Sequence, residues 1–190
     1  MAKLGCNFTD FGAVVSNMRA FLTHSHEDYP VNPDCADEWA VYANYCDQVT
    51  VELRTDVGGP TYHPNAAVVD AYLIKVKGKS GDQKCLVYFH GGGGIGGTAE
   101  EHNYYCWRMA VDYDATVINV NYRLAPEHKI PCGIDDSYAA VKWVIEKASE
   151  LGIDSNRIAT IGESGGGFMV AGASMRLGEA NEADLIKFAA

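Results

Sequence analysis

The chain has 190 residues, 47% of them hydrophobic and 21% charged, which is the composition of an ordinary globular protein with one core. Its formal net charge of −10 argues against nucleic acid or an anionic membrane surface as a partner, because both repel an acidic protein that lacks a basic patch. No apolar run is long enough to span a bilayer, and residues 1–22 lack a signal-peptide core, so we expect a cytoplasmic protein.

Residues 1–46 form the first predicted unit. Apolar side chains recur there every three to four residues, Phe8, Phe11 and Phe21 among them, and this spacing is typical of an amphipathic helix. We expect a cap or lid segment ahead of the sheet. Its aromatic side chains would serve equally well as an apolar substrate wall or as packed core.

Two runs rich in β-branched and aromatic residues follow, at 48–57 and 65–78, and the breaker VGGPTYHP separates them. They predict an antiparallel strand pair. From residue 84 onward, short apolar runs at 84–90, 115–124 and 157–162 alternate with helical patterns.

The first of these helices is predicted within 99–114, and the second runs from Asp136 or Ser137 to Leu151, with Gly152 as its stop signal. Strands that are apolar on both faces and separated by helices indicate βαβ crossovers. We therefore predict an α/β fold with a mainly parallel sheet and helices on both faces, with residues 47–190 as the core of a single domain.

The cysteines show no C-x-x-C spacing, and several stand within apolar segments. Small buried thiols are therefore expected, in preference to disulfides or a zinc site. The six are Cys6, Cys35, Cys46, Cys85, Cys106 and Cys132.

Two glycine-rich turns follow predicted strands. In HGGGGIGGT (90–98), Gly91, Gly93 and Gly96 have dinucleotide-loop spacing, but no lysine follows and no acidic residue ends the next strand, so phosphate binding is disfavoured. In GESGG (162–166), Ser164 occupies the nucleophile position of a G-x-S-x-G turn between strand and helix. Together the turns would gather backbone N–H groups able to hold an oxyanion at the carboxyl ends of a parallel sheet.

Three motifs stand in order along the chain: YFHGGGG (88–94), NYRLAPEHKIPCGIDDSYAAVKWV (121–144) and DSNRIATIGESGGG (154–167). With them, the sequence from about residue 84 onward resembles the hormone-sensitive-lipase-like family of α/β-hydrolases. This resemblance implies an α/β-hydrolase fold that hydrolyses a small-molecule carboxylic ester through an acyl-enzyme, without a metal or organic cofactor.

The resemblance also implies roles for individual residues. Ser164 matches the nucleophile, while Gly92, Gly93 and Gly165 match the N–H donors of the oxyanion hole. His90 is expected to orient the glycine loop. Glu163 and Gly165 depart from the pattern, since aspartate and alanine are usual at these two positions.

The remaining chemically interesting side chains are interpreted as structural. We expect the two aspartates at 135 and 136 to cap the second helix. The scaffold residues by this interpretation are Tyr122, Arg123, His128, Asp135 and Asp136, and the histidines interpreted as surface or core residues are His24, His26, His63 and His102.

In the hydrolase order, an acid and then a histidine follow the nucleophile. After Ser164 the chain has Glu179, Glu182 and Asp184, but all of its histidines precede the serine. The terminal DLIKFAA resembles the opening of another buried strand, so we expect a C-terminally truncated core.

Several explanations of the missing partners stay open. The acid and base would lie beyond Ala190, or a second chain would supply them at the unfinished sheet edge, an edge that also makes a homo-oligomer possible. Alternatively, the protein is a non-catalytic small-molecule binder on the same fold, or an inactive interaction protein.

Overall fold

The computed structural model describes residues 44–190. The predicted cap segment at 1–46 therefore lies outside the described residues except for its last three positions. The predictions for Phe8, Phe11 and Phe21 lie wholly outside them, as do those for Cys6, Cys35, His24 and His26.

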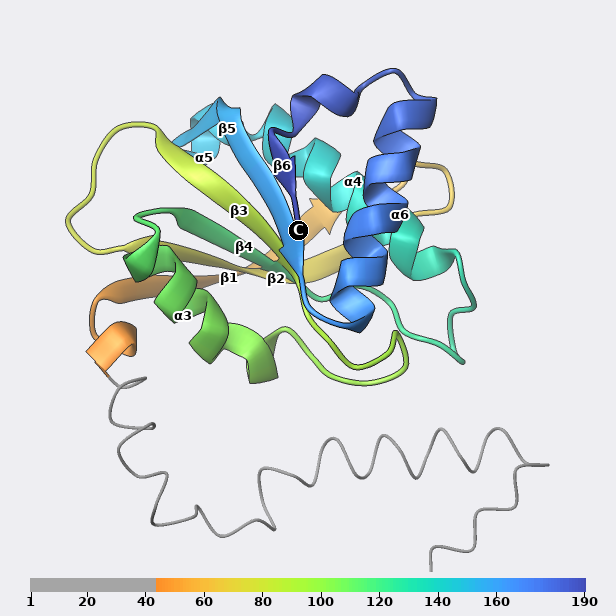
Figure 1. The fold of residues 1–190 in the computed structure, drawn as a ribbon, viewed down its shortest axis with the longest axis horizontal. Helices are drawn as coiled ribbons and strands as arrows, with labels where there is room; N and C mark the ends of the chain where they lie inside the picture. Colours follow the sequence, from red (N-terminus) through yellow and green to blue (C-terminus); the bar gives the residue numbers. More distant parts are fainter. Residues whose placement is uncertain (1–43) are drawn as a thin grey trace, which may run out of the picture.

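A six-stranded sheet forms the centre of the structure, in the order β1-β2-β4-β3-β5-β6 (Figure 1). The β1–β2 pair is antiparallel, as predicted, and β2 is also antiparallel to β4, whereas β4, β3, β5 and β6 are mutually parallel. The strands are β1 (Val49–Gly58), β2 (Val68–Val76), β3 (Gln83–Phe89), β4 (Thr116–Val120), β5 (Ile153–Gly162) and β6 (Phe188–Ala189).

Helices connect the parallel strands and cover both faces of the sheet. Helix α3 lies on one face, and α4 and α6 lie side by side on the other (Figure 1). In chain order these segments are η2 (Glu100–His102), α3 (Asn103–Asp112), α4 (Cys132–Glu146), α5 (Ala148–Leu151), α6 (Gly165–Glu179) and η3 (Ala183–Leu185).

Strand β3 supplies side chains to the cores on both faces. Val87 and Phe89 belong to the larger cluster, with Trp143 of α4, while Tyr88 belongs to the smaller cluster, with Cys106 of α3. Both clusters are almost wholly shielded from solvent. The uninterrupted apolar strands thus reflect burial on both faces, and the predicted α/β architecture is confirmed.

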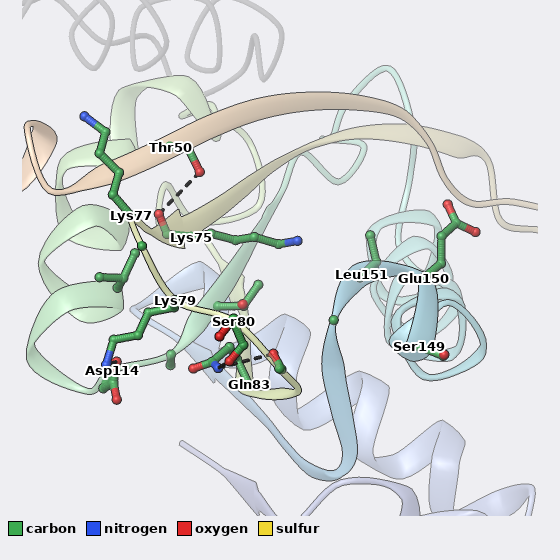
Figure 2. Close-up of a pocket in the computed structure, with 16 residues that line it drawn as sticks. Thr50, Lys75, Lys77, Lys79, Ser80, Gln83, Asp114, Ser149, Glu150 and Leu151 are labelled. Atoms are coloured by element: carbon green, nitrogen blue, oxygen red, sulfur yellow. Dashed lines mark hydrogen bonds and ion pairs between the residues drawn. The ribbon is translucent and has the colours of Figure 1, made fainter.

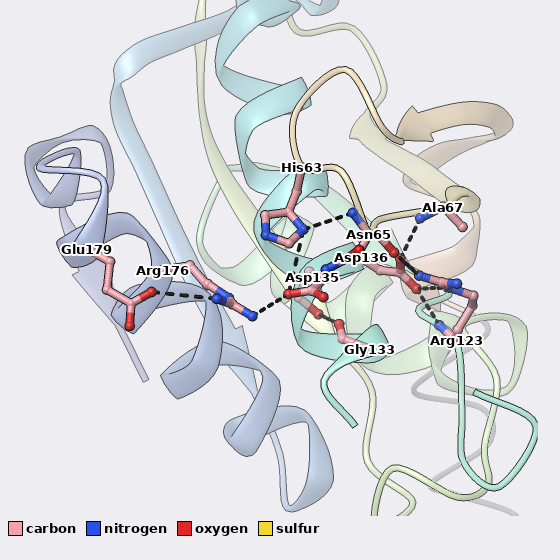
Figure 3. A network of polar contacts seen from close by, with 10 residues as sticks. His63, Asn65, Ala67, Arg123, Gly133, Asp135, Asp136, Arg176 and Glu179 are labelled. Atoms are coloured by element: carbon pink, nitrogen blue, oxygen red, sulfur yellow. Dashed lines mark hydrogen bonds and ion pairs between the residues drawn. The ribbon is translucent and has the colours of Figure 1, made fainter. Parts of the chain in front are cut away.

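The second predicted helix begins earlier than expected. Helix α4 starts at Cys132, and no side chain caps it, so the prediction that Asp135 and Asp136 are caps is wrong. Both carboxylates are instead buried and bind arginines from other segments (Figure 3). The predicted stop is confirmed, since Gly152 ends α5 with a left-handed φ of 65°.

Asp136 accepts hydrogen bonds from the backbone N–H of Ala67 at 2.8 Å and from the guanidinium of Arg123 at 2.8 Å, while Asp135 accepts one from Arg176 of α6 at 2.7 Å (Figure 3). Buried carboxylates need such partners, because an unpaired buried charge is costly. The two aspartates therefore tie α4 to the loop before β2, to the segment after β4 and to α6. The interpretation of Arg123 as scaffold agrees with these contacts.

The last residues form a strand, as predicted, but this strand is not buried. Phe188 and Ala189 pair in parallel with Ala159 and Thr160 of β5, yet both are exposed, with Phe188 at 65%. The prediction of a buried strand is therefore wrong for these residues, because β6 is the outermost strand of the sheet.

Four free cysteines fall within the described residues. Cys85 and Cys106 are buried, as predicted, and burial raises the pKa of both thiols. For Cys46, which is exposed, the prediction is wrong, and Cys132 is half-buried. No helix between residues 44 and 190 is sufficiently long and apolar to cross a membrane.

Candidate active site

The two glycine turns meet at the carboxyl ends of β3 and β5. These strands are neighbours, with Phe89 opposite Gly162, and from them the chain runs to opposite sides of the sheet. α/β proteins commonly bind ligands beyond the carboxyl ends of the strands at such a switch in direction. A Cβ atom added at Gly165 would lie 2.6 Å from the backbone nitrogen of Gly93, so the glycine loop lies directly against the start of α6.

Ser164 stands at the sharp turn between β5 and α6. Its φ of 50° and ψ of −115° are strained for a residue with a side chain, and such a conformation costs about 1–3 kcal/mol. A side chain at Gly162 would overlap Gly166, and one at Gly166 would overlap the carbonyl of Phe89. The turn therefore requires both glycines, and it leaves the serine exposed at the amino end of a long helix.

The N–H groups of Gly92, Gly93 and Gly165 have no acceptor among residues 44–190. Gly92 and Gly93 have φ values of 115° and 65°, conformations that favour glycine, and a Cβ at Gly92 would overlap the carbonyl of Gly96. Unpaired N–H donors beside a helix amino end can bind an anion or a developing oxyanion.

His90 is fully buried beneath the glycine loop. Its Nδ1 lies 2.8 Å from the carbonyl oxygen of Gly91, so Nδ1–H donates to that carbonyl in the neutral ring. Burial lowers the pKa of His90 to about 4; the hydrogen bond to Gly91 partly opposes this, and the nearby His102 adds to it. A buried neutral ring that holds the loop backbone fits the orienting role expected of His90.

The segment after β4 supports the same loop. Tyr122 donates from its hydroxyl to the carbonyl of His90 at 2.7 Å, and its ring stacks on the histidine ring with centroids 4.5 Å apart. Ala125 donates from its N–H to the carbonyl of Gly94 at 2.9 Å. The interpretation of Tyr122 as scaffold agrees with these contacts. His128, by contrast, is exposed.

One contact at this site, between the side chains of His102 and Glu163, was not predicted from the sequence. The sequence pattern assigns His102 only to the surface or core, but its Nε2 lies 3.2 Å from Oε1 of Glu163, the residue before Ser164. The signal in the sequence is positional, because His102 follows β3 and Glu163 directly follows β5, and parallel strands bring their carboxyl ends together. That signal has meaning only once β3 and β5 are known to be neighbours.

No hydrogen bond or ion pair between described residues joins Ser164 to a histidine or a carboxylate side chain. His63 lies 3.7 Å from Asp135 of α4, and His90 and His102 bind the groups given above. The described residues therefore hold the serine and the N–H donors but no base in contact with the serine.

Two pockets border the sheet. One of about 470 Å³ lies at the amino ends of the parallel strands, the end remote from Ser164, and Lys79 pairs there with Asp114 (Figure 2). A smaller one, of about 310 Å³, lies on the α3 face and reaches Glu163. The strained serine and the N–H donors without a described acceptor, rather than pocket size, identify the carboxyl ends of β3 and β5 as the candidate site.

A family model described as the alpha/beta hydrolase fold matches residues 86–190, which include both glycine turns and α6. The chain belongs to the hormone-sensitive-lipase-like α/β-hydrolases. The resemblance in the three motifs and the hydrolase fold expected from it are thereby confirmed.

Relatives of this hydrolase chain include esterase LipI of Mycobacterium tuberculosis, 38% identical over 122 residues that cover 57% of this chain and 38% of LipI. Carboxylesterase NlhH of the same species is 52% identical over 82 residues, covering 43% of this chain and 26% of NlhH. A Pyrobaculum calidifontis esterase structure superposes with a TM-score of 0.70 at 27% identity, covering 95% of this chain and 51% of that one. The chain thus spans about half the length of these relatives or less.

Proposed function

We propose that the protein containing this chain is a carboxylic ester hydrolase with Ser164 as its nucleophile. One observation carries the proposal: Ser164 is held exposed in a strained turn, directly beside N–H groups that have no acceptor among the described residues. Strain of this kind persists where the surrounding structure enforces it, and it is concentrated at active sites. Relatives named esterase and carboxylesterase support the reaction class.

In the proposed reaction, Ser164 Oγ attacks the ester carbonyl carbon while a base takes the hydroxyl proton. The N–H groups of Gly92, Gly93 and Gly165 bind the oxyanion of the tetrahedral intermediate. Collapse breaks the bond to the alkoxy oxygen, and the alcohol leaves with the proton held by the base. Water then attacks the acyl carbon and gives a proton to the same base. The bond from the acyl carbon to Ser164 Oγ breaks, the base returns the proton to Oγ, and the carboxylic acid leaves.

We further propose that the acid and base come from outside residues 1–190, either from a further part of the protein or from a second chain at the β6 edge. No histidine follows Ser164 within these residues, although the hydrolase order places the base after the nucleophile. The described histidines bind other groups or, like His128, lie exposed without a contact to Ser164. The length of the relatives leaves room for both residues.

Hydrolysis of p-nitrophenyl acetate and butyrate by the whole protein tests this function. We expect turnover that Ser164→Ala reduces by about 10⁴-fold or more, because the nucleophile acts as a unit with its base. Thr160→Ser is a suitable control, since Thr160 is a buried β5 residue that lines neither described pocket. Equal turnover by wild type and Ser164→Ala would contradict the proposal.

A non-catalytic binder of small molecules is the second candidate. It is favoured by the absence of a base in contact with Ser164 among the described residues, because N–H donors can hold an anion without one. This candidate predicts that the folded whole protein binds an ester or phosphonate without turnover and without a covalent adduct on Ser164. An inactive interaction protein would show neither binding nor turnover.

A further inference from the structure

We infer that His102 and Glu163 are positioning residues, whose side-chain contact holds the glycine loop at 91–97 against the turn that carries Ser164. This inference rests on the proposed function, because it concerns the placement of the oxyanion donors. It assigns a role to two side chains that the mechanism above does not use.

Each ring nitrogen of His102 faces an oxygen atom at hydrogen-bonding distance. Glu163 Oε1 lies 3.2 Å from His102 Nε2, and His102 Nδ1 lies 3.0 Å from the carbonyl oxygen of Thr98. Both partners are hydrogen-bond acceptors, and a ring nitrogen that carries a proton donates to the oxygen it faces. With the His102 side chain only 17% exposed, the ring orientation is fixed from two sides.

The Glu163 side chain also lies across the beginning of the glycine loop. A Cβ atom added at Gly91 would stand 3.1 Å from Glu163 Oε1 and 3.3 Å from its Cγ, so the carboxylate packs on the Gly91 backbone. On the other side of the loop, His102 stacks on His90 with ring centroids 5.4 Å apart, and His90 donates to the carbonyl of Gly91. The pair therefore acts on Gly91 both directly and through His90.

These contacts link the two halves of the proposed oxyanion hole. Gly91 leads into the donors Gly92 and Gly93, and Glu163 is bonded to Ser164, which precedes the donor Gly165. Donors must be held within about 0.5 Å of the productive position, and losing one costs about 10²- to 10³-fold in rate. Loosening the pair, which displaces donors without removing them, should cost about tenfold.

A positioning role is favoured over a purely structural one by where the pair lies. The Glu163 side chain is 47% exposed at the rim of the sheet and belongs to neither hydrophobic cluster. Exposed ion pairs contribute little to folding, with a typical value of about 0–1 kcal/mol. Removing the Glu163 charge should therefore change the rate far more than the stability.

The test compares steady-state hydrolysis of p-nitrophenyl butyrate by the whole protein and its variants Glu163→Gln, His102→Ala, His102→Gln and Glu163→Gln/His102→Ala. We expect the first two to lower kcat about tenfold with KM unchanged within about twofold, because the pair orients donors used in the transition state. The double variant should be no slower than the worse single variant, since both changes break one contact.

His102→Gln supplies the rescue, because its amide can donate to Glu163 from near the Nε2 position. We expect it to recover most of the kcat that His102→Ala loses. Glu150→Gln is the matched control: Glu150 is a comparably exposed carboxylate, paired with Arg54 and Lys147 at the end of the sheet remote from Ser164, and its loss should leave kcat unchanged.

Titration of Ser164 with a fluorophosphonate counts competent sites in each variant, so kcat is expressed per folded site. If wild type turns over and Glu163→Gln and His102→Ala match it, the inference is wrong while the proposed function stands. Multiplicative losses in the double variant, or a rise in KM at constant kcat, would also overturn it. A wild-type protein with neither turnover nor adduct would refute the proposed function itself, and the inference with it.

Discussion

At the scale of single residues, the sharp turn at Ser164 was predictable because its signal is local. The G-x-S-x-G turn needs glycines on either side of the serine, and the structure shows the overlaps that make Gly162 and Gly166 necessary. The contact between Glu163 and His102 was not predictable in this way, because the two residues are far apart in the sequence. They meet only through the pairing of β3 with β5.

The buried His90 should make the stability of the protein depend on pH. Its pKa of about 4 lies below the value of 6.5 for an exposed histidine, so the unfolded chain binds a proton between these values that the folded protein does not. Stability therefore falls as the pH is lowered from about 7 to about 4, by about 3 kcal/mol from this group alone.

Urea unfolding of wild type and His90→Asn at about pH 7 and about pH 4.5 measures this effect. Asparagine keeps a donor for the Gly91 carbonyl but does not titrate, so the advantage of wild type over the variant should shrink as the pH is lowered. Parallel losses in the two proteins would show that His90 is not the group responsible.

At the scale of elements, the approach of α6 to β3 depends on one missing side chain. A Cβ at Gly166 would overlap the Phe89 carbonyl, and because that atom belongs to the backbone it cannot rotate away. Gly166→Ala should therefore lower the unfolding free energy by about 2–3 kcal/mol or more and displace the turn that carries Ser164.

Gly178, near the other end of α6, provides the matched control. A Cβ there would meet nothing within 4 Å, so Gly178→Ala should raise the unfolding free energy by about 0.5–1 kcal/mol. Chemical denaturation of both variants checks the contrast. Equal effects would mean that helix propensity alone, and not contact with β3, governs the substitutions.

The elements also show where sequence patterns mislead. Asp135 and Asp136 are of a residue type that often caps helices, but α4 begins earlier, at Cys132. Both carboxylates instead form ion pairs with arginines that are distant in the sequence. Residue type indicated that these aspartates were structural. Their partners depend on tertiary packing, which a single sequence does not display.

At the scale of the whole molecule, the parallel sheet was predictable, since burial on both faces requires continuous apolar strands. The order of the strands and the exposure of β6 were not, because neither follows from the pattern of a single strand. The outer strand β6 exposes Phe188, and exposed strand edges favour association.

We expect residues 1–190, expressed alone, to self-associate through this edge, and Phe188→Lys to shift the species toward monomer because it places a charge on the outer strand. Sedimentation velocity over a range of concentrations measures the change. A chain that stays monomeric at every concentration, or association unaffected by the substitution, would contradict this expectation.

The central claim is that Ser164 is a nucleophile, and covalent labelling tests it most directly. The whole protein is incubated with a small fluorophosphonate, which forms a bond to the serine oxygen and releases fluoride, and the adduct is located by mass spectrometry. The proposal predicts one adduct per protein, on the peptide that contains Ser164, and none in Ser164→Ala. A folded protein that remains unlabelled, or is labelled only on another residue, would contradict it.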